Sequence, residues 1–335
     1  MIYTITLNPA LDRTLWVSEI KEDVSNRIIR EESYPGGKGI DVSKVLTALG
    51  VPNRALGFIA GFAGRQLEAQ LTRDGTDCSF IPVSGETRTN VVIHELGSGR
   101  QIILNSAGPE VKPFELLEIS DLVRKIEEPE FVSIGGSLPP RAHPEVYRKI
   151  IETAKLRRAK VVLDVDREAL LVGIRGKPDV IKPNIHELSA LVGKRLEKRG
   201  EILEAAREIN RRGVGIVLVS MGPRGILLVS EGKAYQAVPP EVEVVNTIGA
   251  GDSSVAGFIY GLVAGRDLKE ALIWATAAGT ATTLRQGTAL ATTGGRGEDR
   301  PPGDGSIRHP LIEDAHRTYR PIVVMSASRY RQLEA

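Results

Sequence analysis

From residue 130 onward, short apolar segments alternate with longer amphipathic ones, and this alternation constrains the fold more than any other feature. The short segments are rich in Val, Ile and Leu, whereas the longer ones repeat apolar residues at helical spacing. The predicted strands are 131–134, 160–163, 180–181, 215–219 and 225–229, and the predicted helices are 114–127, 144–157, 186–192 and 201–212. This order is typical of a mostly parallel sheet with helices on both faces. The sequence therefore predicts an α/β fold.

The first 105 residues predict one more core strand and a second, smaller sheet. Residues 2–7 are apolar and have the length of a buried strand. Four further segments alternate polar and apolar residues, which makes them too polar for the centre of a parallel sheet. These segments are 15–20, 27–34, 87–96 and 101–105. We expect them to form a separate accessory sheet.

Composition excludes several classes of function. The 335-residue chain has a net charge of only +2 and 4% aromatic residues, so we expect no nucleic-acid partner. No apolar run approaches the ~20 residues that span a bilayer, so we expect no membrane partner. Cys78 is the only cysteine, which excludes a disulfide framework and a thiolate metal cluster. The N-terminus begins directly as a strand without a signal sequence, so we expect a cytoplasmic protein.

A glycine turn at residues 246–251 predicts an anion site. Val242, Val244 and Val245 before it are typical of the end of a strand, and helical spacing follows it up to Gly265. Such a turn leaves the first N–H groups of the helix free, and these groups bind anions. Asp252 follows directly, either as an N-cap or as a base that takes a proton from a hydroxyl group. Its ordinary pKa of ~3.9 leaves it ionised at neutral pH.

Polar residues follow most of the predicted strands. In an open α/β sheet the carboxyl ends of strands form the ligand site. The polar positions are Asp12, 136–140, Asp164, 182–184 with Glu187, and 220–225. We therefore expect one site along this edge, although Asp12 alone is equally typical of a turn.

Other segments keep two interpretations each. The turn at 36–39, which contains Lys38 but lacks Walker A spacing, is either structural or lies against a polar ligand. Arg88 shares a strand face with Asn90 and either binds a phosphate or faces solvent. The small residues of 266–288 allow close helix packing or a groove for a planar base. In the tail, 292–306 has linker composition, 321–325 predicts a strand and 328–335 a helical turn.

Residues 36–50 and 246–254 resemble the two signatures of the ribokinase-like carbohydrate kinases. Five further motifs resemble the hexose-phosphate branch, which includes 1-phosphofructokinase, the minor 6-phosphofructokinase and tagatose-6-phosphate kinase. These motifs are 6–12, 85–90, 136–139, 182–188 and 219–225. The resemblance runs in order from residue 1 to about residue 290. It implies a three-layer α/β core at 1–290, with a β-sheet lid formed by about 13–34 and 86–106. Residues 291–335 would then be an atypical tail.

The resemblance also implies the cofactors, the partner and the roles of individual residues. ATP and Mg²⁺ would be the cofactors, and two copies would pair through the lid. Asp252 would be the general base beside an anion hole formed at Gly249, Ala250 and Gly251. The substrate-binding residues would be Asp12, Arg27, Gly37, Lys38, Asp41, Arg88, Asn90 and Ser137, with Arg27 and Arg88 on the substrate's phosphate. The nucleotide site would comprise Lys182, Asn184, Ser220, Gly222, Gly225, Ala278 and Gly279, and Asn184 and Glu187 would organise Mg²⁺.

Three positions depart from the family pattern, and the change at Asn246, ahead of the glycine turn, is mild. Asp41 stands where the family usually has Asn, and an ionised Asp accepts hydrogen bonds but does not donate them. Arg141 adds positive charge after the motif at 136–139, as a phosphate contact or as an exposed residue.

The activity that this resemblance implies is ATP-dependent phosphorylation of fructose 1-phosphate or fructose 6-phosphate to fructose 1,6-bisphosphate. Tagatose 6-phosphate is an alternative substrate, and a non-catalytic sugar-phosphate sensor is an alternative function. An oxidoreductase is disfavoured because no G-x-G-x-x-G motif follows the first strand.

Overall fold

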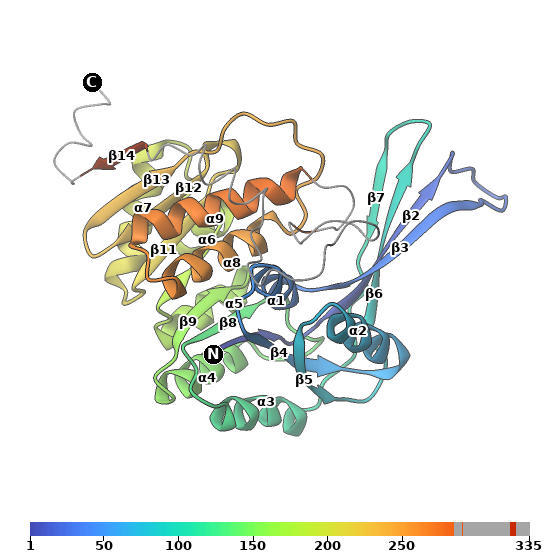
Figure 1. Cartoon of the computed structure of the whole chain (residues 1–335), viewed down its shortest axis with the longest axis horizontal. Helices are drawn as coiled ribbons and strands as arrows, with labels where there is room; N and C mark the ends of the chain where they lie inside the picture. Colours follow the sequence, from blue (N-terminus) through green and yellow to red (C-terminus); the bar gives the residue numbers. More distant parts are fainter. Residues whose placement is uncertain (285–289, 291–321, 326–335) are drawn as a thin grey trace, which may run out of the picture.

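The computed structural model describes residues 1–284, 290 and 322–325. In this part of the chain a large sheet lies between two layers of helices, and a smaller sheet projects from one side (Figure 1). The large sheet has the order β14-β13-β12-β11-β10-β9-β8-β1-β4-β5, and the smaller one has the order β3-β2-β6-β7. This arrangement confirms the predicted α/β fold and the predicted accessory sheet.

The elements have the following bounds. The strands are β1 Ile2–Thr6, β2 Ala10–Val17, β3 Ile28–Gly36, β4 Asn53–Ile59, β5 Asp77–Pro82, β6 Arg88–Glu95, β7 Gln101–Leu104, β8 Phe131–Gly135, β9 Lys160–Asp164, β10 Val180–Ile181, β11 Ile216–Ser220, β12 Ile226–Ser230, β13 Lys233–Ala237 and β14 Ile322–Met325. The α-helices are α1 Lys38–Ala48, α2 Gly61–Arg73, α3 Pro113–Lys125, α4 Glu145–Leu156, α5 Arg167–Gly173, α6 Ile185–Val192, α7 Arg199–Arg211, α8 Ala250–Val263 and α9 Leu268–Thr283. Short 3₁₀ turns lie at Ile174–Gly176 and Gly222–Arg224.

The strands from β5 to β11 in the large sheet are parallel, and those from β11 to β14 are antiparallel. Parallel strands point the same way, so their carboxyl ends share one edge of the sheet. The predicted site residues at the ends of β8, β9, β10 and β11 therefore lie along one edge.

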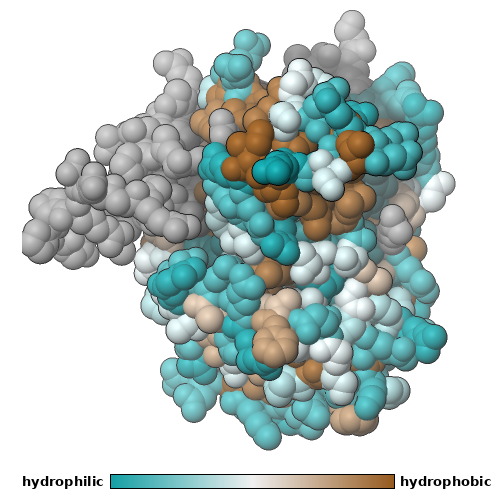
Figure 2. Space-filling model, turned by 90° about the vertical axis from the view of Figure 1, so that its right-hand side faces the viewer, coloured by the Kyte–Doolittle hydropathy of each residue, from teal (hydrophilic) through white to brown (hydrophobic). Residues whose placement is uncertain are grey.

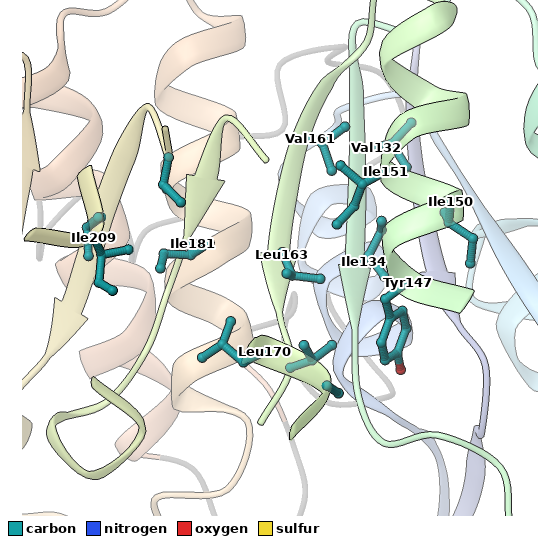
Figure 3. Packing of buried hydrophobic residues seen from close by; sticks show 14 of the residues in the cluster. Val132, Ile134, Tyr147, Ile150, Ile151, Val161, Leu163, Leu170, Ile181 and Ile209 are labelled. Carbon is teal, nitrogen blue, oxygen red and sulfur yellow. The ribbon is translucent and has the colours of Figure 1, made fainter. Parts of the chain in front are cut away.

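Both faces of the large sheet are apolar, and alternate side chains of each strand supply them. On β9, Val161 and Leu163 pack with the helices α3 to α7, whereas Val162 packs with α1, α8 and α9. Figure 3 shows part of the first face, where Ile150 and Ile151 of α4 lie against the strands. Burial on both faces explains why the core strands are continuous apolar runs.

The smaller sheet carries the strands predicted as a lid. β2 pairs antiparallel with β3 and parallel with β6, and β6 pairs antiparallel with β7. β2 begins at Ala10, earlier than predicted, so Asp12 lies inside a lid strand and not in a turn after β1. Its alternative interpretation as a turn residue is therefore wrong.

The strand predicted at Val242, Val244 and Val245 is absent, and these residues form an exposed connection from β13 to α8. Pro239 and Pro240 precede them, and proline lacks the N–H group that a sheet ladder needs. On the side away from β12, β13 pairs with β14, which confirms the strand predicted at 321–325. The predicted linker 292–306 and helical turn 328–335 lie outside the described residues. Among the helices that the structure describes, none is sufficiently long and apolar to span a bilayer.

Tyr147 links the core to the edge that carries the site. Its side chain is fully buried on α4, and its hydroxyl donates a hydrogen bond of 3.0 Å to the carbonyl of Gly136, just after β8 (Figure 3). Replacement of Tyr147 by Phe leaves that carbonyl without this donor. We expect Tyr147→Phe to lower the free energy of unfolding by about 1–3 kcal/mol, measured by urea denaturation.

Tyr260→Phe is the matched control. Tyr260 packs edge-on against Trp274 at 4.7 Å between ring centroids, and Phe preserves that contact. We expect Tyr260→Phe to change the free energy of unfolding by less than about 0.5 kcal/mol, because this residue is partly exposed. Equal losses in the two variants would contradict a special role for the Tyr147 hydroxyl.

Candidate active site

The N-terminus of α8 is the centre of the site. Gly249 is its N-cap, with a left-handed φ of 75° that strongly favours glycine. Asp252 is the third helical residue, so the N-cap interpretation of Asp252 is wrong. Within the described part of the chain, the backbone N–H groups of Gly251 and Asp252 have no hydrogen-bond acceptor, as expected in a first turn. This end of α8 can therefore donate to an anion.

Helix α9 fixes the position of α8 by close contact. A Cβ atom on Gly257 of α8 would lie 2.9 Å from the Cβ of Ala278, and one on Gly261 would lie 2.6 Å from the Cα of Ala271. A Cβ on Gly279 of α9 would lie 3.0 Å from the carbonyl oxygen of Ala250. Close helix packing therefore accounts for the small residues of α9. The contact predicted between adenine and Ala278 and Gly279 stays a prediction.

A carboxylate and two ammonium groups lie beside the N-terminus of α8. Asp164, at the end of β9, has one oxygen 3.1 Å from Lys38 Nζ and the other 3.1 Å from Lys182 Nζ. The side chains of Asp164 and Lys182 are only 4% and 7% exposed. A Cβ atom on Gly251 would lie 3.0 Å from Lys182 Nζ, so glycine allows α8 to approach the lysine.

These neighbours change the proton affinity of Asp252. Burial among protein atoms, and then repulsion by Asp164, raise the pKa of Asp252 to about 7, although Lys38 and Lys182 oppose the shift. Burial also disfavours the charge of Asp164, but Lys182 and Lys38 hold its pKa below the usual range. Burial likewise opposes the charge of Lys38, yet Asp164, Asp252 and Glu187 raise its pKa. Our sequence-based assumption of an ordinary, fully ionised Asp252 is therefore wrong.

A second acidic group lies between α1 and the lid. Asn90 Nδ2 on β6 donates a hydrogen bond of 2.8 Å to Asp12 Oδ1 on β2. Asp41 lies 3.6 Å from Lys44 Nζ, and both side chains are largely buried. Burial raises the pKa of Asp12, and burial together with Asp252 and Asp12 raises that of Asp41 well above its usual value. The structure thus brings Asp12, Asp41 and Asp252 within electrostatic reach of each other.

Arg88 lies on the lid side of this acidic group. Its Nε donates to the carbonyl of Asn8 at 3.2 Å, and its Nη1 donates to the carbonyl of Ser106 at 3.3 Å. Burial lowers the pKa of Arg88 against the attraction of Asp12. A guanidinium has five N–H donors, so donors remain for an anion. The side chain of Asn8 also donates to Ser137 Oγ at 3.4 Å, which places Ser137 in the same region.

Arg27 stays apart from these residues. It is exposed and precedes β3, and within the described chain no hydrogen bond or ion pair links it to another predicted site residue. Its predicted contact with a substrate phosphate stays a prediction.

Asn184 and Glu187 form a capping box at the start of α6. The Asn184 side chain accepts from the Glu187 N–H at 2.9 Å, and Glu187 Oε2 accepts from the Asn184 N–H at 2.8 Å. Among the residues that the structure describes, no group of three His, Cys, Asp or Glu side chains is arranged to hold a metal. One carboxylate oxygen of Glu187 remains outside the capping box, which suits an ion that keeps most of its water ligands.

The glycines after β11 belong to the same edge. Asn184 forms an isolated parallel bridge with Ser220, and Gly222 follows with open space beside its Cα. A Cβ atom on Gly225 would overlap the carbonyl oxygen of Ala237, so glycine is required there by the chain itself. The predicted nucleotide contacts of Ser220, Gly222 and Gly225 stay predictions. Gly37 is the N-cap of α1, where a Cβ would lie 2.8 Å from Thr6 Cγ2.

The model of the pfkB family carbohydrate kinases matches residues 5–293. The chain belongs to this family. It is 35% identical over 286 residues to the 1-phosphofructokinase of Bacillus subtilis, covering 85% of this chain and 93% of the relative. It is also 35% identical over 288 residues to the D-tagatose-1-phosphate kinase of Bacillus licheniformis, covering 86% and 94%. The structure of Escherichia coli phosphofructokinase-2 in complex with fructose-6-phosphate superposes with a TM-score of 0.84 at 30% identity, covering 94% of this chain and 98% of that one.

Family membership makes the chain a carbohydrate kinase, as the sequence predicted, with a ribokinase-like fold. The structure adds three side chains that our sequence analysis left without a role: Asn8, Lys44 and Asp164. Asp164 carried a signal, because it follows a predicted strand, but only the three-dimensional arrangement pairs it with two lysines. Nothing in the local sequence distinguishes Lys44 from a surface lysine.

The raised pKa of Asp252 predicts a pH-dependent effect on stability. Between its ordinary pKa of 3.8 and about 7, Asp252 holds more protons in the folded chain than in the unfolded one. Folding stability from this residue is therefore lost as pH rises through that window. We expect Asp252→Asn to match the native protein near pH 4 and to exceed its unfolding free energy by about 1 kcal/mol or more at pH 8.

The measurement is urea denaturation of both proteins across this pH range. Asp121→Asn is the control, because Asp121 is an exposed carboxylate on α3 that forms an ion pair with Arg124 of the same helix. The difference in unfolding free energy between Asp121→Asn and the native protein should stay nearly constant with pH. An Asp252→Asn curve that runs parallel to the native curve would refute the shifted pKa.

Proposed function

We propose that this kinase transfers the γ-phosphate of ATP to a ketohexose phosphate, with fructose 1-phosphate as the first candidate and fructose 6-phosphate as the second. Either substrate yields fructose 1,6-bisphosphate. The observation that carries the proposal is the arrangement of Asp252 at the N-terminus of α8, with two lysines on one side and the acidic group and Arg88 on the other. The named activities of the B. subtilis and B. licheniformis relatives support a sugar that already carries a phosphate.

Asp252 acts as the general base. Its carboxylate takes the proton of the sugar hydroxyl as that oxygen forms a bond to the γ-phosphorus, and the bond from phosphorus to the ADP oxygen breaks. A pKa near 7 suits this role, because an effective base has a pKa close to the working pH. The N–H groups of Gly251 and Asp252, with Lys38 and Lys182, neutralise charge on the transferred group.

ATP and Mg²⁺ fit the residues at this edge. The free N–H groups of α8 and the two lysines form a cationic surface for phosphates. Asn184 and Glu187 would hold Mg²⁺ through water, because their side chains already bind each other's backbone. When bound, Mg²⁺ supplies positive charge to the phosphate oxygens.

The acidic group and Arg88 bind the sugar. Asp12 and Asp41 accept hydrogen bonds from sugar hydroxyls, and Asn90 orients Asp12. Arg88 binds the phosphate that the substrate already carries, since its planar fork matches phosphate geometry. A non-catalytic sensor needs no base of near-neutral pKa, so Asp252 favours the enzyme. The cytoplasmic location and the domain limit at residue 290 stay predictions.

The first test is an ADP-release assay with ATP and Mg²⁺ on fructose 1-phosphate, fructose 6-phosphate, tagatose 1-phosphate, tagatose 6-phosphate and free fructose. We expect kcat/KM to be at least ~10³-fold higher for one phosphosugar than for free fructose, because a buried phosphate site is left unpaired by the neutral sugar. Free fructose as the best substrate would reject the phosphosugar assignment.

Replacement of the base tests the mechanism separately. Asp252→Asn should lower kcat by at least ~10² and leave KM nearly unchanged, because a general base acts only in the transition state. Asp121→Asn on the surface of α3 should retain native kinetics. An Asp252→Asn enzyme with native kcat would remove Asp252 from the proposed role.

Two copies of the chain pair through the lid in this proposal. Figure 2, which views the molecule from the lid side, shows apolar side chains gathered over its upper part. The exposed apolar residues of the lid are Val24, Ile28, Ile29, Leu96, Ile103 and Leu104. Exposed apolar patches of this kind typically mark protein interfaces.

Ile29→Glu tests the lid interface. A charge placed in an apolar interface is costly to bury, so we expect the variant to sediment as a monomer where the native protein sediments as a dimer. Leu156→Glu is the matched control, because Leu156 is an exposed apolar residue at the end of α4, outside the lid. Loss of the dimer in the Leu156 variant, with the Ile29 variant unchanged, would place the interface elsewhere.

A further inference from the structure

Asp164 occupies a position that the sheet register defines. β9 and β10 are parallel, with Val162 opposite Val180 and Leu163 opposite Ile181. The next residues are Asp164 and Lys182, and the Lys182 N–H bonds to the Leu163 carbonyl at 3.3 Å. Asp164 is therefore the last residue of β9, and Lys182 directly follows β10, at the edge where the site lies.

Stability alone is a poor explanation for the ion pair between Asp164 and Lys182. Both partners leave water almost completely, and a buried ion pair often adds less stability than apolar residues of the same size. A second ammonium group, from Lys38 at the start of α1, contacts the other oxygen of the same carboxylate. Without Asp164, two like charges would lie close together and repel each other. The carboxylate thus holds together two cations from different elements.

Both cations lie beside the N-terminus of α8, where the proposed function puts the transferred phosphate. Lys182 Nζ would be 3.0 Å from a Cβ on Gly251, whose N–H group is free in the described chain. Lys38 is within electrostatic reach of Asp252 and Glu187. The carboxylate of Asp164 therefore contacts the two lysines in the way that an anionic ligand would.

We propose that Asp164 is a positioning residue for phosphoryl transfer, which holds the ammonium groups of Lys38 and Lys182 beside the N-terminus of α8 ready for phosphate oxygens. This inference rests on the proposed function, because it requires that α8 and the lysines bind the transferred phosphate. It assigns Asp164 no contact with the substrate. Its charge also acts on the base, since Asp164, Lys38 and Lys182 all affect Asp252. Asp41 faces Asp252 from α1 as a further acidic neighbour.

Two variants separate the position of the carboxylate from its charge. Asp164→Glu keeps the charge but moves the oxygens by one methylene group, whereas Asp164→Asn keeps the shape and removes the charge. Asp179→Asn is the matched control, because Asp179 flanks the opposite end of β10, accepts a hydrogen bond from Val161 N at 2.8 Å and lies 3.8 Å from Lys155. The readouts are kcat/KM with ATP, Mg²⁺ and the preferred phosphosugar from about pH 5.5 to 9, together with thermal unfolding.

Both Asp164 variants should lower the plateau of kcat/KM at least about tenfold, because small misplacements of binding groups have effects of this size or larger. Only Asp164→Asn should move the acidic inflection to lower pH, by about one unit, the scale on which a neighbouring charge acts. Asp179→Asn should change neither. The titration of substrate phosphates is common to all variants and cancels in the comparison.

A folded Asp164→Glu enzyme with a native plateau would overturn the positioning role. An Asp164→Asn enzyme with an unmoved inflection would overturn the effect of the Asp164 charge on Asp252. If Asp164→Asn fails to fold, the Asp164→Glu plateau still decides the matter. A native kcat in Asp252→Asn would instead refute the proposed general base. The two outcomes therefore distinguish failure of the proposed function from failure of the positioning role of Asp164.

Discussion

Burial of the parallel sheet on both faces is the constraint on which the rest of the structure depends. Apolar side chains of β1, β8, β9 and β11 fill both helical layers, which leaves the ends of the strands as the places for polar groups. Because the strands are parallel, these ends meet at one edge, where Asp164 ends β9 and where Lys182 and Asn184 follow β10. The location of the site is thus a consequence of how the core is packed.

The same burial creates the electrostatics of the site. Carboxylates and lysines that are buried away from water interact strongly with each other. The pKa of each group therefore depends on the charges of its neighbours. Asp164 keeps its charge because two lysines surround it, whereas burial, and then repulsion by Asp164, hinder the ionisation of Asp252. One carboxylate is held as a fixed anion and the other is free to exchange a proton near neutral pH.

Patterns within single segments predicted much of this architecture, and long-range contacts explain the rest. Helices α3, α4, α6 and α7 and the small sheet follow directly from apolar periodicity. The strand expected at 242–245 does not form. Apolar composition alone does not reveal that Pro239 and Pro240 interrupt strand pairing, or that β13 pairs with β14 instead. Likewise, the motifs identified Asp252, but the effect of Asp164 on it joins residues 88 positions apart in the chain and required the fold.

The division of the site between two sheets has a consequence for divergence within the family. Asp252 and the lysines belong to the core, where contacts between α8 and α9 leave no space even for a methyl group. Asp12, Asn90 and Arg88 belong to lid strands, where many side chains are only half-buried. Under the proposed function, changes in the lid would alter the sugar that is accepted while the chemistry of transfer is retained. Relatives with different named sugars, such as fructose and tagatose phosphates, are what such a separation of parts would produce.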